Sequence, residues 1–239
     1  GIHGSARASP RTSLSGYPFR TPSRGATVCG VTQGIPRDAV AFFAELELNN
    51  ERSWWAANQD RWKRSVRGPV QAVCEALAGE FGEAKLFRPH RDVRFSADKS
   101  PYKTHQGAVV GTSPGVGYYV QVSSRGLMTG AGWYLPSPAQ VAAYREAVLD
   151  DDAGDALAGI VEALGAWGAE IDGDLLKTAP RGVDPDHPRI GLLRHRSLLV
   201  SIPHGEPAWL GGDDVAEHVR EDWRAYRPLV EWLDEHLSS

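Results

Sequence analysis

The spacing of apolar residues changes along the chain and predicts helices first, strands next and helices again. Apolar positions three and four residues apart occur over about 36–48, 51–67 and 69–81, which predicts three helices. We expect Gly68 and Pro69 to separate the second helix from the third, because proline interrupts helical hydrogen bonding. The third helix carries an apolar stripe that consists of Val70, Val73, Cys74, Leu77 and Phe81. Cys74 is therefore expected to be a small buried hydrophobe and not a nucleophile.

The middle of the chain has the two-residue period of β-strands. Over 118–123, apolar residues alternate with more polar ones, which predicts a half-buried strand. A turn that ends at Gly126 and a partner strand over 127–135 would complete a hairpin. A shorter strand is expected over 108–111.

Helical patterns return in the last third of the chain. Helices are expected over 136–149, 154–166 and 214–237, with one strand over 198–202. Strands grouped between helices, without strict alternation, favour an α+β fold with a mostly antiparallel sheet packed by helices. We expect 35–239 to form a single domain of this kind.

The first 34 residues differ in composition from the rest. The stretch 1–34 has four Arg, six Gly, five Ser and no Asp or Glu. It cannot bury enough apolar surface to offset the entropy of ordering, so we expect a flexible basic arm. The composition also resembles a transit peptide, but a non-functional leader or a misassigned start is the interpretation that we favour.

Composition and charge exclude several classes of protein. The formal net charge of −4 gives no general basic surface for nucleic acid, which we do not expect as a partner. Two cysteines without a CxxC motif encode neither a disulfide framework nor a zinc ribbon. No apolar run is long enough to cross a membrane. A cytoplasmic globular protein is the expectation.

One segment concentrates charged side chains. Between Lys85 and His105 there are six Lys and Arg against two Asp, a local charge of +4. Arginine and lysine bind carboxylates and phosphates, so an anionic ligand is expected. The candidate ligand-binding residues here are Arg88, Arg91, Arg94, Lys99 and Lys103. The candidate catalytic residues are Asp92, Asp98 and Tyr102. A structural ion-pair network is the alternative, and the acidic stretch 150–174 is a further source of counter-charge.

The same segment resembles the signature of a bacterial family, domain of unknown function 2461. The residues that carry the resemblance are Arg88, Arg91, Asp92, Arg94, Phe95, Asp98, Lys99 and Tyr102. It extends to the Phe-Phe, Asn-Asn-Glu-Arg and Trp-Trp motifs of 42–55, and resumes at 130–133, 180–182 and 186–193. It covers roughly 35–239, and it implies neither a substrate nor a mechanism.

Two further groups of residues can be explained either by a purely structural role or by a role in ligand binding. Asn49, Asn50, Glu51 and Trp54 stand at a helix start, where capping and aromatic packing are favoured over an anion site as the explanation. Arg181 and His187 lie in a loop rich in Pro and Gly, and are the remaining candidate ligand-binding residues.

Other motifs do not support a specific chemistry. The sequence at 111–115 matches the G-x-S-x-G pattern of hydrolases, but Pro114 has no N–H for an oxyanion hole, so a turn is expected. The histidines lack metal-ligand spacing, and no metal site is predicted. The cofactor, the reaction and the oligomeric state are not specified by the sequence.

The leading hypothesis is therefore a site for an anionic small molecule in the segment 88–103. Nucleic-acid binding through the basic arm and the same cluster is the second hypothesis. The third is an interaction module that uses the eight tryptophans and an acidic surface, with the cluster as a structural ion-pair network.

Overall fold

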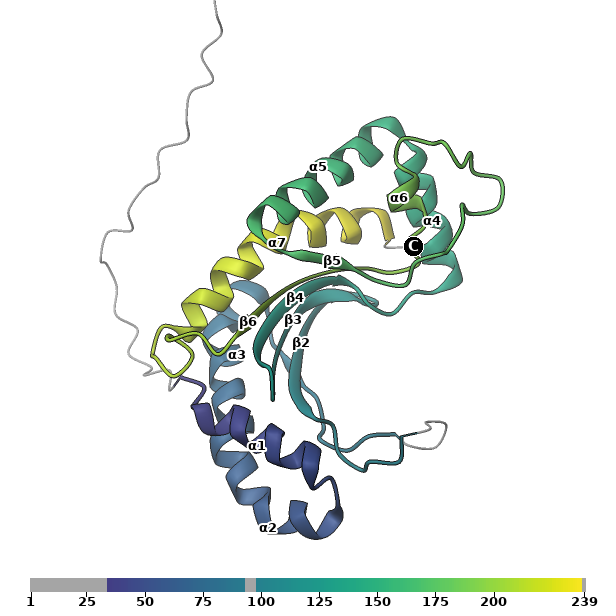
Figure 1. Ribbon diagram of the computed structural model, residues 1–239. Helices are drawn as coiled ribbons and strands as arrows, with labels where there is room; N and C mark the ends of the chain where they lie inside the picture. The colour runs from purple at the N-terminus through teal and green to yellow at the C-terminus, as the bar shows by residue number, and fades with distance from the viewer. Residues whose placement is uncertain (1–33, 93–97, 238–239) are drawn as a thin grey trace, which may run out of the picture. The chain divides into compact units, whose positions relative to one another are not determined.

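A computed structural model describes residues 34–92 and 98–237 (Figure 1). The arm predicted over 1–34 lies outside the described residues except for Gly34, and Arg94 of the basic cluster lies outside them as well. No helix within the described ranges is long and apolar enough to cross a bilayer.

The strands form one six-stranded sheet in the order β1-β2-β3-β4-β6-β5, and each neighbouring pair is antiparallel. The strands are β1 (Lys85–Leu86), β2 (His105–Ser113), β3 (Val116–Ser123), β4 (Gly126–Trp133), β5 (Glu170–Asp172) and β6 (Leu198–Gly205). The predicted α+β class is confirmed. The edge strands β1 and β5 were not predicted, because two or three residues are too few to show a period.

The helices agree with the predicted ones, with one exception and one addition. They are α1 (Arg37–Leu48), α2 (Arg52–Trp62), the π-helical turn η1 (Lys63–Arg67), α3 (Gly68–Phe81), α4 (Pro138–Leu149), α5 (Asp151–Trp167), α6 (Ile190–Leu193) and α7 (Val215–Leu237). The addition is α6, a single turn that is too short for an apolar pattern to reveal.

The exception is the break expected at Gly68 and Pro69, which is wrong. The helix α2 continues through η1 directly into α3, and the Gly68 N–H donates to the carbonyl of Lys63, five residues earlier. The wider π-helical turn accommodates the Pro69 ring, which in a regular α-helix would clash with the carbonyl four residues before it.

The helices cover one face of the sheet and leave the opposite face open. The long helix α7 packs on β3 and β4, while α1 and α3 contact β3 and β2. Figure 1 shows that the sheet is curved, with its concave side facing away from these helices. The predicted apolar side of α7 is confirmed as buried and consists of Val219, Trp223, Tyr226, Val230, Leu233 and Leu237.

Glycines allow the central strands to approach each other closely on the open side. Gly117 of β3 and Gly132 of β4 are cross-strand partners. A Cβ atom on Gly117 would lie 2.2 Å from the carbonyl oxygen of Val110, and one on Gly132 would lie 2.2 Å from that of Leu198. Gly132 also has a φ of +128°, which other residues rarely adopt. A larger residue at either position would force the strands apart.

A buried carboxylate on the helical side ties two strands to α7. Asp222 Oδ2 accepts a hydrogen bond from Thr129 Oγ1 of β4 at 2.7 Å, and lies 2.7 Å from His204 Nε2 of β6. Asp222 is only 5% exposed, so these contacts replace its hydration. The tie joins β4 and β6 beside the register shift between Leu127 and Met128.

We predict that Asp222→Ala lowers the free energy of unfolding by about 2–4 kcal/mol, because Thr129 and His204 lose a buried acceptor. Urea unfolding followed by tryptophan fluorescence measures the change. The control is Asp213→Ala, which removes an exposed acid and should alter stability by less than about 0.5 kcal/mol. Equal losses in the two variants would contradict the tie.

Candidate functional site

Strand alternation determines which residues reach the open side of the sheet, called the open face below. Val109, Tyr119, Gly130 and Ser201 are successive cross-strand neighbours on β2, β3, β4 and β6. Because side chains alternate along a strand, the residues that flank them point towards the helices. Other open-face side chains around this row include those of Lys85, Gln121, Met128, Leu199, Glu170 and Asp172.

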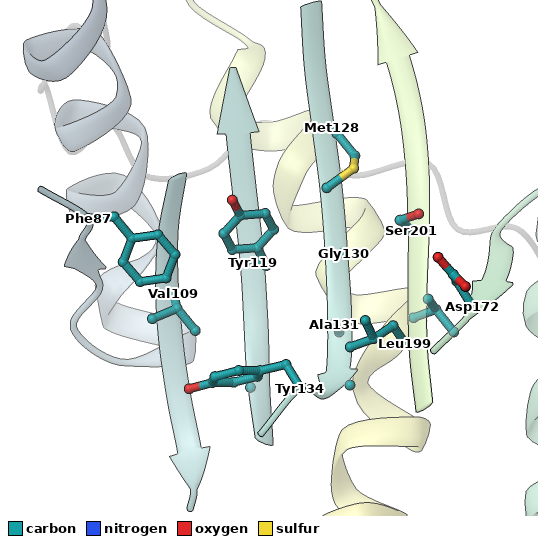
Figure 2. Close-up of a pocket in the computed structure, with 13 residues that line it drawn as sticks. Phe87, Val109, Tyr119, Met128, Gly130, Ala131, Tyr134, Asp172, Leu199 and Ser201 are labelled. Atoms are coloured by element: carbon teal, nitrogen blue, oxygen red, sulfur yellow. The ribbon is translucent and has the colours of Figure 1, made fainter. Parts of the chain in front are cut away.

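A cavity of about 350 Å³ lies on the open face over β4 (Figure 2). Its floor is the backbone of Gly130 and Gly132, where the absence of side chains leaves a depression between the flanking strands. Figure 2 shows aromatic and apolar walls on both sides of this floor, formed by Phe87, Val109, Tyr119, Tyr134, Met128 and Leu199. A largely apolar lining with few polar groups is typical of small-molecule sites.

Besides the hydroxyls of Tyr119 and Tyr134, the cavity has two polar side chains on its β6 and β5 side. They are the Ser201 hydroxyl and the Asp172 carboxylate. Asp172 accepts a hydrogen bond from the Gly173 N–H at 2.7 Å, and no lysine or arginine of the described residues forms an ion pair with it. Burial lowers the pKa of nearby His195, which is therefore neutral at pH 7 and does not neutralise Asp172.

The basic segment continues β1 and β2 beyond the sheet as an antiparallel pair of extended segments, 87–92 and 101–105. These segments and the residues 98–100 are called the basic ribbon below. The Arg91 N–H donates to the carbonyl of Pro101 at 2.9 Å, and the Lys103 N–H donates to that of Pro89 at 2.8 Å. Figure 1 shows the basic ribbon projecting from one corner of the sheet, next to α1 and α2.

Asn50 attaches the basic ribbon to the start of α2. Its side chain donates to the Tyr102 carbonyl at 2.9 Å and accepts from the Tyr102 N–H at 3.1 Å, as a neighbouring strand would. The Tyr102 ring stacks on Trp55 with centroids 4.2 Å apart. The capping expected of Asn50 is not observed, since Glu51 occupies the N-cap of α2 and makes no side-chain capping bond.

The predicted catalytic residues belong to the basic ribbon and do not line the cavity. Tyr102 is buried against Trp55. Asp98 is held by Ser100 and by an ion pair with Arg91, and these hydrogen bonds lower its pKa from 3.8 to about 2. Asp92 is exposed. The contacts of Tyr102 and Asp98 explain both as parts of the ribbon, and catalysis by any of the three stays a prediction.

Lys103 brings a positive charge to the edge of the cavity. Its Nζ atom lies 4.9 Å from the centroid of Phe87, which lines the cavity. Within the described residues no carboxylate forms an ion pair with Lys103, and burial together with nearby Arg88 lowers its pKa. Burial and then the charges of Lys103 and Arg91 lower the pKa of His105, so this imidazole is neutral at pH 7.

The other predicted ligand-binding residues are distributed over two places. Arg88 and Lys99 are exposed on the basic ribbon. Arg181 and His187 lie in the segment between β5 and β6, where His187 Nδ1 accepts from the Arg189 N–H at 3.0 Å. This segment leaves the sheet at the end of β5, diagonally opposite the start of β2, so it does not share a pocket with the basic ribbon.

The acidic residues of 150–174 do not neutralise the basic ribbon with the ion pairs seen in the structure. Asp151 and Asp155 pair with Arg189, and Asp174 pairs with Arg196. Among the described residues, no ion pair therefore joins an acid of 150–174 to Arg88 or Lys103.

Neither the cysteine nor the metal chemistry of the described residues offers a second site. Cys74 is buried in the stripe of α3, and burial raises the pKa of its thiol to about 12, as expected of a buried hydrophobe. Over residues 34–92 and 98–237, no group of three His, Cys, Asp or Glu side chains is placed to hold a metal ion.

The match to a known family covers most of this structure. The model of a family of conserved hypothetical proteins, DUF2461, matches residues 38–232, from α1 into the last turns of α7. The chain belongs to the DUF2461 family. The resemblance seen in the sequence is thus confirmed. No curated protein and no solved structure matches the chain.

In this DUF2461 chain the described signature residues Arg88, Arg91, Asp92, Asp98, Lys99 and Tyr102 belong to the basic ribbon, whereas the cavity beside it was not predicted. Tyr119 and Gln121 occupy the more polar of the two alternating sets of positions in 118–123, and such a set ordinarily predicts a solvent-exposed face of a strand. The sequence signal that could have located the cavity is the pair Gly130 and Gly132 within one strand. Glycines inside a strand often mark a site where a ligand or another backbone approaches the strand closely.

We predict that Asn50→Ala releases the basic ribbon from α2 and costs about 1–2 kcal/mol, because the Tyr102 N–H and carbonyl lose their partner. Amide hydrogen exchange at Tyr102 should become faster. The matched control is Asn49→Ala, whose side chain bonds only to Glu45 of its own helix. Unchanged exchange at Tyr102 in Asn50→Ala would refute the attachment.

We also predict that the Asp98 carboxyl titrates near pH 2, below its ordinary value of 3.8. Because the folded-state pKa is lowered, its hydrogen bonds stabilise the ribbon above about pH 4 and are lost as the pH falls towards 2. Carboxyl NMR titration tests this. Arg91→Gln should raise the pKa only in part, since Ser100 makes the larger contribution. A full return to 3.8 would assign the shift to Arg91 instead.

Proposed function

We propose that the open face binds an elongated, apolar small molecule with an acidic group, and that Lys103 receives the acid. The observation that carries this proposal is a glycine-floored apolar cavity with a lysine beside it that has no carboxylate partner among the described residues. The cavity accounts for the apolar body of the ligand, and the basic ribbon accounts for its charge.

The shape of the cavity favours a flat apolar body. A ligand over Gly130 and Gly132 would rest on bare backbone, with Tyr119 on one side and Leu199 on the other. Tyr119 donates its hydroxyl to Gln121 at 2.8 Å, and burial raises its pKa, so the ring presents its apolar surface with its polar end already satisfied. Each buried CH₂ group of a ligand would contribute about 0.8 kcal/mol.

The charges at the cavity edge favour an anion over a neutral group. Lys103 is partly buried next to Arg88, and both effects disfavour its charged form. An acidic group of a ligand near Lys103 Nζ would instead favour the charged form of the lysine, because its negative charge offsets the repulsion between Lys103 and Arg88. The same anion would also offset the charges of Lys103 and Arg91 that keep His105 neutral, so the pKa of His105 should rise on binding.

The test uses biphenyl-4-carboxylate and its neutral analogue biphenyl-4-carboxamide in calorimetric titrations at pH 7. We expect the carboxylate to bind more tightly, and Lys103→Gln to weaken it about fivefold, the equivalent of roughly 1 kcal/mol for a partly exposed ion pair. The affinity of the carboxamide should not change. Lys63→Gln, which removes an exposed lysine on η1, is the matched control.

NMR titration of His105 supplies an independent measurement. Saturating biphenyl-4-carboxylate should raise its pKa, and the carboxamide should leave it unchanged. The proposal is refuted if neither biphenyl compound binds, or if both bind equally and Lys103→Gln affects neither.

A further inference from the structure

We infer that the ligand carries a hydrogen-bond donor at the end opposite its acidic group. This inference rests on the proposed function and concerns the far wall of the same cavity. The class of ligand is then an elongated apolar acid with a hydroxyl or amino group at its other end.

The far wall offers acceptors to a ligand and no cation. The carboxylate of Asp172 accepts hydrogen bonds only, and the described residues provide no lysine or arginine that pairs with it. Ser201 stands next to it on the same side of the cavity, and its hydroxyl can accept as well as donate. Neutral His195 does not change the sign of the charge there. A second acidic group on the ligand would be repelled at this wall.

Strand spacing sets the length of the ligand. Phe87, next to the Lys103 ammonium, directly follows β1, and Asp172 lies on β5, five strand positions from β1 in the order of the sheet. Neighbouring strands are about 4.8 Å apart, so the two polar ends are separated by roughly 24 Å along the sheet before side chains reach inwards. A single aromatic ring is too short to meet both ends, whereas two linked rings with polar groups at both ends are suitable.

The position of Asp172 on β5 distinguishes it from the other acid on that short strand. Glu170 and Asp172 both alternate onto the open face, opposite Ser201 and Leu199 respectively. Both acids are exposed, but only Asp172 lines the cavity. The two acids therefore form a matched pair for mutation.

The experiment compares 4′-hydroxybiphenyl-4-carboxylate with its 4′-methoxy analogue, which keeps the acid and the rings but cannot donate. We expect the hydroxy compound to bind about threefold more tightly, because only its hydroxyl can donate a hydrogen bond to the Asp172 carboxylate, which is exposed at the wall of the cavity. Asp172→Ala should abolish this preference, Ser201→Ala should reduce it, and Glu170→Ala should preserve it. Circular dichroism verifies that each variant is folded.

The outcomes separate this inference from the proposed function. Equal binding of the hydroxy and methoxy compounds, with Lys103→Gln still weakening both, would overturn the donor requirement and leave the anion site intact. A preference for the hydroxy compound that survives Asp172→Ala would also overturn it. If no biphenyl acid binds, the proposed function itself fails.

Discussion

The packing of α7 on β3 and β4 is the constraint on which the rest of the structure depends. The apolar side of α7 is wide enough to bury one face of the central strands, and α4 and α5 pack on α7 instead of covering the other face. Side chains on a strand alternate, so this one-sided burial directs Tyr119, Met128 and Ser201 to the open face. The Asp222 tie stabilises the same arrangement on the helical side of the sheet, because the Asp222 carboxylate of α7 bonds to Thr129 of β4 and to His204 of β6.

The fold could be predicted largely from local periodicity, and the exceptions have physical reasons. The stripes of α3 and α7 and the alternation in β3 follow from burial on one side, so the sequence encodes them directly. The continuity through Gly68 and Pro69 depends on a π-helical turn, which has no apolar period of its own. The strands β1 and β5 depend on their partners, because neither is long enough to be recognised without β2 or β6.

The candidate site could be predicted only in part. The density of charge in the segment 88–103 indicated Lys103, whose ammonium lies 4.9 Å from the ring of Phe87 at the edge of the cavity. It could not indicate that Tyr102 faces Trp55, because that contact joins residues from distant parts of the sequence. The structure has a feature that fits each interpretation of the cluster. Arg91 and Asp98 form an ion pair, as a structural network would, while Lys103 has no carboxylate partner among the described residues, as an anion site would require.

The glycines of the cavity floor also restrict how relatives with this fold can diverge in what they bind. At Gly130 and Gly132 a new Cβ atom would collide with a carbonyl oxygen of β6, that of Val200 at 2.9 Å and that of Leu198 at 2.2 Å. A change of binding at these positions would therefore be coupled to a loss of folding. Met128 and Tyr134 border the same space without that penalty. Ligand selectivity can thus evolve by substitution of the wall residues, while the floor glycines cannot be replaced without disturbing the sheet.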